Sequence, residues 1–177
     1  MDPEREIRNA LVRGLSPYFE VLEEVSLLTR SNEKVRADLL LSTTVGSSAI
    51  TIAVEIKSQP PKQPKNYRDT FYQAYQYVEA LTADQRLPER GINFALIRQD
   101  RPKDFWTTST PNPEYFKVQA SSEMDGIEMA FNTLEVGCLM FNDSKPEFRF
   151  GPNCAWNQKD GWKEEFYRRK FHQRFSK

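Results

Sequence analysis

The sequence predicts an α/β fold in which a mixed β-sheet is flanked by helices. Two segments carry apolar residues at helical spacing, and three strand-like segments separated by short connections lie between them. The chain has 177 residues, of which 38% are hydrophobic and 12% aromatic, so it suits one domain with a packed core rather than a disordered chain. We expect a single domain, 1–177, whose core spans residues 1–98 and whose remainder, 99–177, is an irregular extension that completes the sheet.

The first helix follows Asp2, which can cap it, and Pro3, which suits the first helical position. Its apolar residues recur at helical spacing and are Ile7, Ala10, Leu11 and Leu15. Glu4 falls on the same face as these residues, where a carboxylate needs a partner or a metal ion. Ser16 and Pro17 end the helix.

Three strands are predicted next, from Phe19 to Leu28, from Val35 to Thr43 and from Ala49 to Ser58. Residues 44–48 form a connection short enough for a β-hairpin, so the second and third strands should pair antiparallel. Apolar side chains alternate along the third strand, at Ile50, Ile52, Val54 and Ile56, and should share one face.

A proline-rich loop from Gln59 to Asn66 precedes a second helix from Tyr67 to Ala83, and a strand from Ile92 to Arg98 follows it. The buried side of that helix is predicted to carry Phe71, Ala74, Val78 and Leu81. Beyond these elements we expect an irregular loop (100–113), strands (115–119, 126–131 and 137–141), a further loop (142–161), and an aromatic, basic helix (162–175).

Charge and composition exclude several classes of function. There are 25 Lys and Arg residues against 25 Asp and Glu residues, so the protein has no overall basic field with which to coat nucleic acid. One histidine and two cysteines without a CxxC motif argue against a structural zinc site. No apolar run could cross a membrane and the first residues do not form a signal peptide, so we expect a cytoplasmic protein with two reduced thiols, Cys138 and Cys154.

The hairpin brings two carboxylates together. If the turn is centred between Gly46 and Ser47, Asp38 lies opposite Glu55 with its side chain on the same face of the sheet. Two facing carboxylates repel each other unless a cation lies between them, and magnesium prefers such oxygen ligands. Lys57 shares that face and could help to deprotonate or orient an attacking water.

Polar residues of the second helix and of the preceding loop should lie near these carboxylates. Gln73 and Tyr77 are four residues apart, so they share one side of the helix and could reach the edge of the pocket. Lys62, Lys65 and Arg68 form a local cationic run that could hold phosphates although the whole chain is neutral.

In these features the sequence resembles the PD-(D/E)XK nuclease superfamily, which has the restriction-endonuclease-like fold. The arrangement is similar to that of Holliday-junction resolvases and of nuclease domains with a Q-x-x-x-Y helix. The resemblance covers about residues 1–98 and is carried by Glu4, by Asp38 in R-A-D-L-L-L, by Glu55 and Lys57 in A-V-E-I-K-S, and by Gln73 and Tyr77. Ala37 stands where the family motif has proline.

The resemblance implies a role for each of these residues. Asp38 and Glu55 would bind the metal, with the Ile56 carbonyl as a further ligand, and Lys57 would act on the attacking water. The supporting residues would be Glu4, which assists the metal or its water, and Gln73 and Tyr77, which organise the site and the backbone phosphate.

These expectations describe a Mg²⁺-dependent nuclease that hydrolyses phosphodiester bonds, with Mn²⁺ as a substitute metal. DNA is the expected substrate, RNA is not excluded, and a homodimer is expected by resemblance. Endonuclease and exonuclease action both stay open. Two alternatives belong to other classes: a nucleic-acid-binding module of the same fold without turnover, and a protein-interaction module that uses the aromatic second half as its contact surface.

Each candidate residue also has a simpler interpretation. Asp38 and Glu55 could be an exposed pair on a solvated sheet face, and Glu4 could only complement the helix dipole. Gln73 and Tyr77 could be ordinary surface residues, and the three basic residues from Lys62 to Arg68 could belong to a solvated loop. The extra acidic residue of the site could be Glu4 or one of three acids near the first strand, Glu20, Glu23 and Glu24. The final aromatic stripe, Tyr167, Phe171 and Phe175, could be a docking face or a base-stacking surface.

Overall fold

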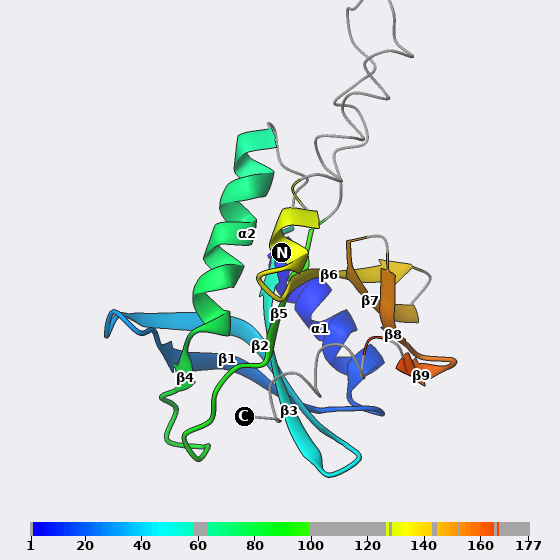
Figure 1. Ribbon diagram of the computed structural model, residues 1–177, viewed down its shortest axis with the longest axis horizontal. Coiled ribbons are helices and arrows are strands. Elements are labelled where there is room, and N and C mark those ends of the chain that lie inside the picture. Colours follow the sequence, from blue (N-terminus) through cyan, green and yellow to red (C-terminus); the bar gives the residue numbers. More distant parts are fainter. Residues whose placement is uncertain are drawn as a thin grey trace, which may run out of the picture.

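The computed structural model describes residues 2–58, 64–99, 127, 129–142, 145–151, 153–164 and 166. It is an α/β structure, and within the described residues nine strands form one mixed sheet in the order β4-β1-β2-β3-β5-β6-β7-β8-β9. Figure 1 shows this sheet with α1 and α2 beside it. The order helix, three strands, helix and strand that the sequence predicts for residues 1–98 is therefore confirmed, with one short strand added.

Helix α1 spans Pro3–Leu15, as predicted. The Asp2 side chain caps it by accepting a hydrogen bond from the Glu4 N–H at 3.1 Å, and Pro3 occupies the first turn. Leu11 and Leu15 are fully buried and anchor the helix to the sheet.

Strands β1 (Glu20–Leu28), β2 (Lys34–Val45) and β3 (Ser48–Ile56) form an antiparallel meander. Val45 pairs with Ser48, so the turn consists of Gly46 and Ser47, and Gly46 supplies the positive φ of 61° that such a turn favours. The pairing from this turn to Leu39 opposite Val54 is the predicted register.

Helix α2 spans Pro64–Val78 and connects β3 to the parallel strand β5, Phe94–Arg98. The predicted helix, 67–83, is placed too late and ends too late. Proline suits the first turn of a helix, which explains the early start. The helix ends early because Leu81–Thr82 forms strand β4, which pairs with the end of β1, and Leu81 is therefore 42% exposed rather than buried on the helix.

The second half contains more strands than the sequence predicts. Strand β6, Val136–Asn142, confirms the predicted strand at 137–141. The predicted loop at 142–161 is wrong, because β7 (Lys145–Phe150) and β8 (Asn153–Asn157) form there and extend the sheet. Side chains at 146, 148 and 150 are buried while those between them are not, which is the alternation typical of a strand with one buried face.

Two other predictions in this half are also wrong. Residues 127 and 129–132 are helical, not the strand predicted at 126–131, and Phe131 packs its ring against Phe71 and Tyr72 of α2. Trp162 belongs to strand β9, Gly161–Trp162, so the predicted helix over 162–175 does not begin there, although residues 164 and 166 within that range are helical. The loop predicted at 100–113, the strand at 115–119 and the final aromatic stripe lie outside the described residues.

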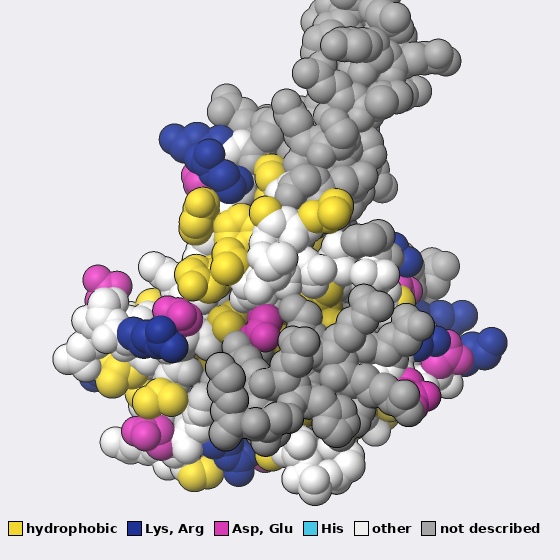
Figure 2. Space-filling model, in the orientation of Figure 1, with side chains coloured by type: hydrophobic (Ala, Val, Ile, Leu, Met, Phe, Trp, Pro, Cys, Tyr) yellow, Lys and Arg dark blue, Asp and Glu magenta, His cyan; other side chains and the backbone are white. Residues whose placement is uncertain are grey.

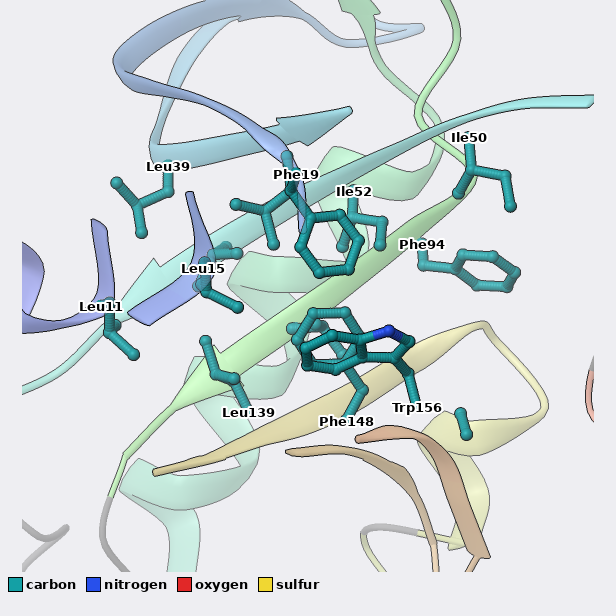
Figure 3. Close-up of a cluster of buried hydrophobic side chains, with 14 of the residues drawn as sticks. Leu11, Leu15, Phe19, Leu39, Ile50, Ile52, Phe94, Leu139, Phe148 and Trp156 are labelled. Atoms are coloured by element: carbon teal, nitrogen blue, oxygen red, sulfur yellow. The ribbon is translucent and has the colours of Figure 1, made fainter. Parts of the chain in front are cut away.

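The two helices cover opposite faces of the sheet. Successive side chains of β2 point to opposite faces of the sheet. Leu39 and Leu41 lie in the same buried cluster as Leu11 of α1, whereas Leu40 lies in the cluster of α2. The α1 side continues into an aromatic cluster in which the rings of Phe19, Phe148 and Trp156 lie together with centroids 4.7–5.4 Å apart (Figure 3). Strand β3 is consequently buried on both faces over most of its length.

Hydrophobic side chains also reach the surface over α2, in the upper part of Figure 2. Tyr72 on this helix is 55% exposed, and Met129 is 58% exposed. Both cysteines are free thiols. Among the described helices, none is long and apolar enough to cross a bilayer.

Candidate active site

The site begins where the β2–β3 ladder ends. The last backbone pair is Leu39 with Val54, and one step further the Asp38 side chain takes over, because its Oδ2 accepts the Ile56 N–H at 2.7 Å. In the register of this hairpin Asp38 faces Glu55, and both side chains lie on the side of the sheet that α2 covers. The simpler interpretation, an exposed pair on a solvated face, is contradicted by a Glu55 side chain that is 3% exposed.

Glu55 is held by two donors. Lys57 Nζ lies 2.5 Å from its Oε1, and the Tyr77 hydroxyl donates to its Oε2 at 2.5 Å. An ion pair and a charge-assisted hydrogen bond together satisfy a buried carboxylate that would otherwise be costly. Lys57 is 32% exposed at its side chain, so its ammonium group bridges the buried acid and the surface.

Tyr77 connects α2 to both strands that carry the acids. Its hydroxyl lies near Glu55 and also 3.0 Å from the Arg36 carbonyl of β2, and the residue is only 1% exposed. Burial raises the pKa of the Tyr77 hydroxyl far above its ordinary value, and the Glu55 charge adds to this, so the group stays a neutral donor. Tyr77 is therefore no surface residue, although Gln73, which interacts with its hydroxyl, is exposed.

Several neighbouring groups shift the pKa of Asp38 in opposite directions. Burial raises the pKa of its carboxyl group, and the nearby charge of Glu55 raises it further. The Ile56 N–H and the positive charges of Lys57 and Arg8 act in the opposite direction without reversing the shift. The carboxyl group of Asp38 is thus less acidic than an ordinary aspartate. A further positive charge nearby would stabilise its ionised form.

Glu4 approaches the site from α1. Its Oε1 accepts from the Ser58 N–H and hydroxyl, each at 3.3 Å, directly after the end of β3. Glu4 is exposed, so the expectation that it points toward the core is wrong; its position in the first turn lets it contact the end of β3 and complement the helix dipole.

A cluster of charges on the other side of Asp38 was not predicted. Arg8, one turn after Glu4, has a side chain only 15% exposed and pairs with Glu24 at 2.7 Å and with Glu23 at 3.7 Å. Glu24 stands opposite Asp38 in the β1–β2 register and has a left-handed φ of 52°, which is strained for a residue with a side chain. The spacing of Glu4 and Arg8, one helical turn apart, was the only sequence signal for this cluster.

The other predicted charged residues lie near β1 and on the first turns of α2. Glu23 and Glu24 are engaged by Arg8, and Glu20 is exposed at the start of β1. Lys65 and Arg68 are exposed on the first turns of α2, and Arg68 lies 3.5 Å from the Asp69 carboxylate. Lys62 lies outside the described residues.

The donor set fits a small divalent cation only in part. Asp38 and Glu55 supply two facing carboxylates, and burial together with the Glu55 charge raises the pKa of Asp38. In the part of the chain that the structure describes, no group of three or more His, Cys, Asp or Glu side chains is arranged to hold a metal ion. Two protein carboxylates are nevertheless enough for magnesium, which commonly keeps several waters.

Comparison of the chain with protein-family models, with curated proteins and with solved structures found no match.

Proposed function

We propose that this protein is a metal-dependent nuclease that hydrolyses phosphodiester bonds, with DNA as its substrate. One observation carries the proposal: Asp38, Glu55 and Lys57 meet at the end of β3, with Tyr77 bound to Glu55. The succession α1, β1, β2, β3, α2 and β5, with the helices on opposite faces, supports a restriction-endonuclease-like core.

Within this proposal, Mg²⁺, or Mn²⁺ in its place, would be held by Asp38 and Glu55 together with the Ile56 carbonyl. When bound, such an ion stabilises the charge that develops on the phosphate and lowers the pKa of a coordinated water. Tyr77 fixes the orientation of Glu55 by donating to one of its oxygens, and the hydrogen bond from Ile56 fixes that of Asp38.

Lys57 is the group that can act on the attacking water. Its ammonium lies at the mouth of the site, partly exposed and directly beside Glu55. There it can orient a water next to the phosphate and exchange a proton with it. Glu4 holds the chain immediately after Lys57 through Ser58, and so helps to keep this lysine in position. Lys62, Lys65 and Arg68 would bind flanking phosphates.

A second candidate function is a nucleic-acid-binding module without turnover. It is favoured by the fact that both oxygens of Glu55 already have partners, Lys57 and Tyr77. In that case the ion pair of Lys57 would be structural, and the basic residues of α2 would bind nucleic acid without cleaving it.

Cleavage assays on supercoiled, linear, branched and single-stranded DNA separate the two candidates. Each substrate is incubated with Mg²⁺, Mn²⁺, Ca²⁺ or EDTA, and binding is measured in parallel in EDTA. The nuclease proposal expects cleavage with Mg²⁺ or Mn²⁺, little with Ca²⁺, and loss of cleavage in Asp38→Asn and Glu55→Gln. The matched control is Glu20→Gln, which removes an exposed acid from β1. Binding without cleavage of any substrate would favour the module, and cleavage in EDTA would contradict the metal assignment.

A further inference from the structure

A recess lies on the part of the sheet formed by β7 and β8. It has a volume of about 610 Å³ and lies between the start of β7, the end of β8 and the turn that follows β8. Tyr18, which follows α1, forms part of its wall. None of the residues that line it belongs to the candidate active site.

The walls of this recess are well ordered by contacts of their own. In the turn after β8, the Asn157 side-chain oxygen accepts from the backbone N–H groups of Lys159 and Asp160, at 3.0 and 2.8 Å. The Tyr18 ring stands edge-on to the buried Trp156, with the ring centroids 5.4 Å apart, and is 38% exposed. An aromatic surface is thus held in place with part of it open to a ligand.

The recess is lined by equal numbers of lysines and acids, and basic residues beside it add positive charge. Its two acidic residues are neutralised by neighbours, because Glu147 pairs with Arg149 and Asp160 pairs with Lys163, each at 2.6 Å. Lys145 and Lys159 also line the recess, and neither forms an ion pair with any described residue. With respect to the described part of the chain, two lysines can therefore contact an anionic ligand.

We propose that this recess binds one nucleotide unit of a single-stranded nucleic acid. Its base would stack on the Tyr18 ring, and Lys145 and Lys159 would contact its phosphates. A ring for stacking combined with basic side chains is the usual composition of a single-strand binding surface. A simple inorganic anion would make no use of Tyr18. The inference deepens the proposed function, on which it rests, by placing an unpaired stretch of the substrate away from the carboxylates.

The test uses a fluorescently labelled oligonucleotide of eight thymidines and an abasic oligonucleotide of the same length, both in EDTA so that no cleavage occurs. Binding is followed by anisotropy. Tyr18→Leu should weaken thymidine binding about tenfold, as loss of one stacked base does, and leave abasic binding unchanged. Tyr18→Phe should retain wild-type affinity, because it keeps the ring that stacks and removes only the hydroxyl. The control, Tyr72→Leu, removes an exposed tyrosine from α2 and should change nothing.

The lysines have a different signature. Lys145→Gln and Lys159→Gln should each weaken both oligonucleotides and make the dependence of log affinity on log salt shallower by about 0.7. The control here is Lys34→Gln, which removes an exposed lysine from the start of β2. Equal affinities for wild type and Tyr18→Leu, or lysine effects no larger than that of Lys34→Gln, would overturn the proposal.

The two proposals fail in different ways. If the protein cleaves DNA but Tyr18→Leu binds thymidines like wild type, the recess is not a nucleotide site while the nuclease proposal stands. If Tyr18 and both lysines behave as expected but no substrate is cleaved, the recess is a nucleotide site and the nuclease proposal fails.

Discussion

The hydroxyl of Tyr77 lies 2.5 Å from Glu55 Oε2, and this contact joins α2 to β3 inside the core. Since the same hydroxyl also lies 3.0 Å from the Arg36 carbonyl, one side chain spans β2, β3 and the helix. The orientation of the buried acid is therefore linked to the packing of the whole helix. This arrangement makes the site sensitive to a change as small as one oxygen atom.

Tyr77→Phe should destabilise the protein. The change removes the donor from Glu55 and leaves a buried oxygen without its partner, which costs about 1–3 kcal/mol. Urea unfolding should show a lower midpoint with an unchanged slope. Tyr75→Phe, a half-buried tyrosine on the same helix, is the control and should differ little from wild type. Equal stability of the two variants would contradict the structural importance of the contact.

Lys57→Ala should separate catalysis from binding. Under the proposed function the single-turnover rate should fall by about two to four decades, as is typical for loss of a proton-transfer group. Affinity should change little, because one phosphate contact among several contributes modestly. Lys65→Gln and Arg68→Gln should instead weaken binding, with a smaller effect on the rate at saturation. If Lys57→Ala loses rate and affinity in equal proportion, the lysine anchors phosphate and does not act on the water.

Asp38→Asn should stabilise the metal-free protein at neutral pH. Burial raises the pKa of Asp38 in the folded state, so the folded protein binds this proton more tightly than the unfolded chain does. That contribution to stability is present below the ordinary pKa of aspartate, about 3.9, and is lost as the pH rises through the raised value.

Asparagine can still accept from Ile56 but never ionises. The gain of Asp38→Asn in unfolding free energy, measured in EDTA, should therefore be clear at neutral pH and disappear toward pH 3. A gain that grows at acid pH instead would mean that the pKa of Asp38 is lowered. Glu20→Gln, at an exposed position, gives the baseline.

Replacing Glu24 tests its strained backbone. Glu24→Ala and Glu24→Gly both remove the carboxylate that Arg8 binds, so they differ only in the side-chain carbon. With a φ of 52°, glycine should be the more stable of the two, which reverses the usual order in a strand. At Glu20, where the backbone is ordinary, alanine should be the more stable. Thermal unfolding of the four variants gives both comparisons.

Gly137→Ala should be strongly unfavourable. A methyl group at Gly137 of β6 would lie 2.4 Å from the Arg149 carbonyl oxygen and 2.9 Å from the Phe150 ring, so β6 and β7 would have to separate. We expect a loss of about 1–3 kcal/mol, as for other overpacked cores. Gly91→Ala, which meets nothing within 4 Å, is the control and should be neutral or slightly stabilising. Chemical denaturation of the three proteins measures the difference.

The first half of the chain could be predicted because its signals are local. The glycine of the hairpin turn fixes the β2–β3 register, and that register alone brings Asp38 to Glu55. The contacts of Tyr77 with Glu55 and of Arg8 with Glu24 depend on how the helices pack, which no local pattern specifies. Their residue types were visible, but their partners were not.

The second half was predicted less well for two reasons. The alternation in β7 was present in the sequence, but the turn-forming residues around it favoured a loop. The end of α2 was placed too late because Leu81 continues the helical spacing of apolar residues. Pairing of Leu81–Thr82 with β1 overrides that local preference, and such pairing depends on a distant segment.

The outer side of β1 has a consequence for how the protein behaves at high concentration. β4 pairs only with Leu27 and Leu28, so among the described residues no strand pairs with the first part of β1 on the edge that faces away from β2. Arg86 donates to the carbonyl groups of Glu23 and Glu24 there, and the left-handed backbone of Glu24 interrupts the regular pleat. A strand edge whose carbonyl groups are already bonded and whose backbone is irregular pairs poorly with another chain. Arg86 and Glu24 therefore disfavour edge-to-edge aggregation of the sheet.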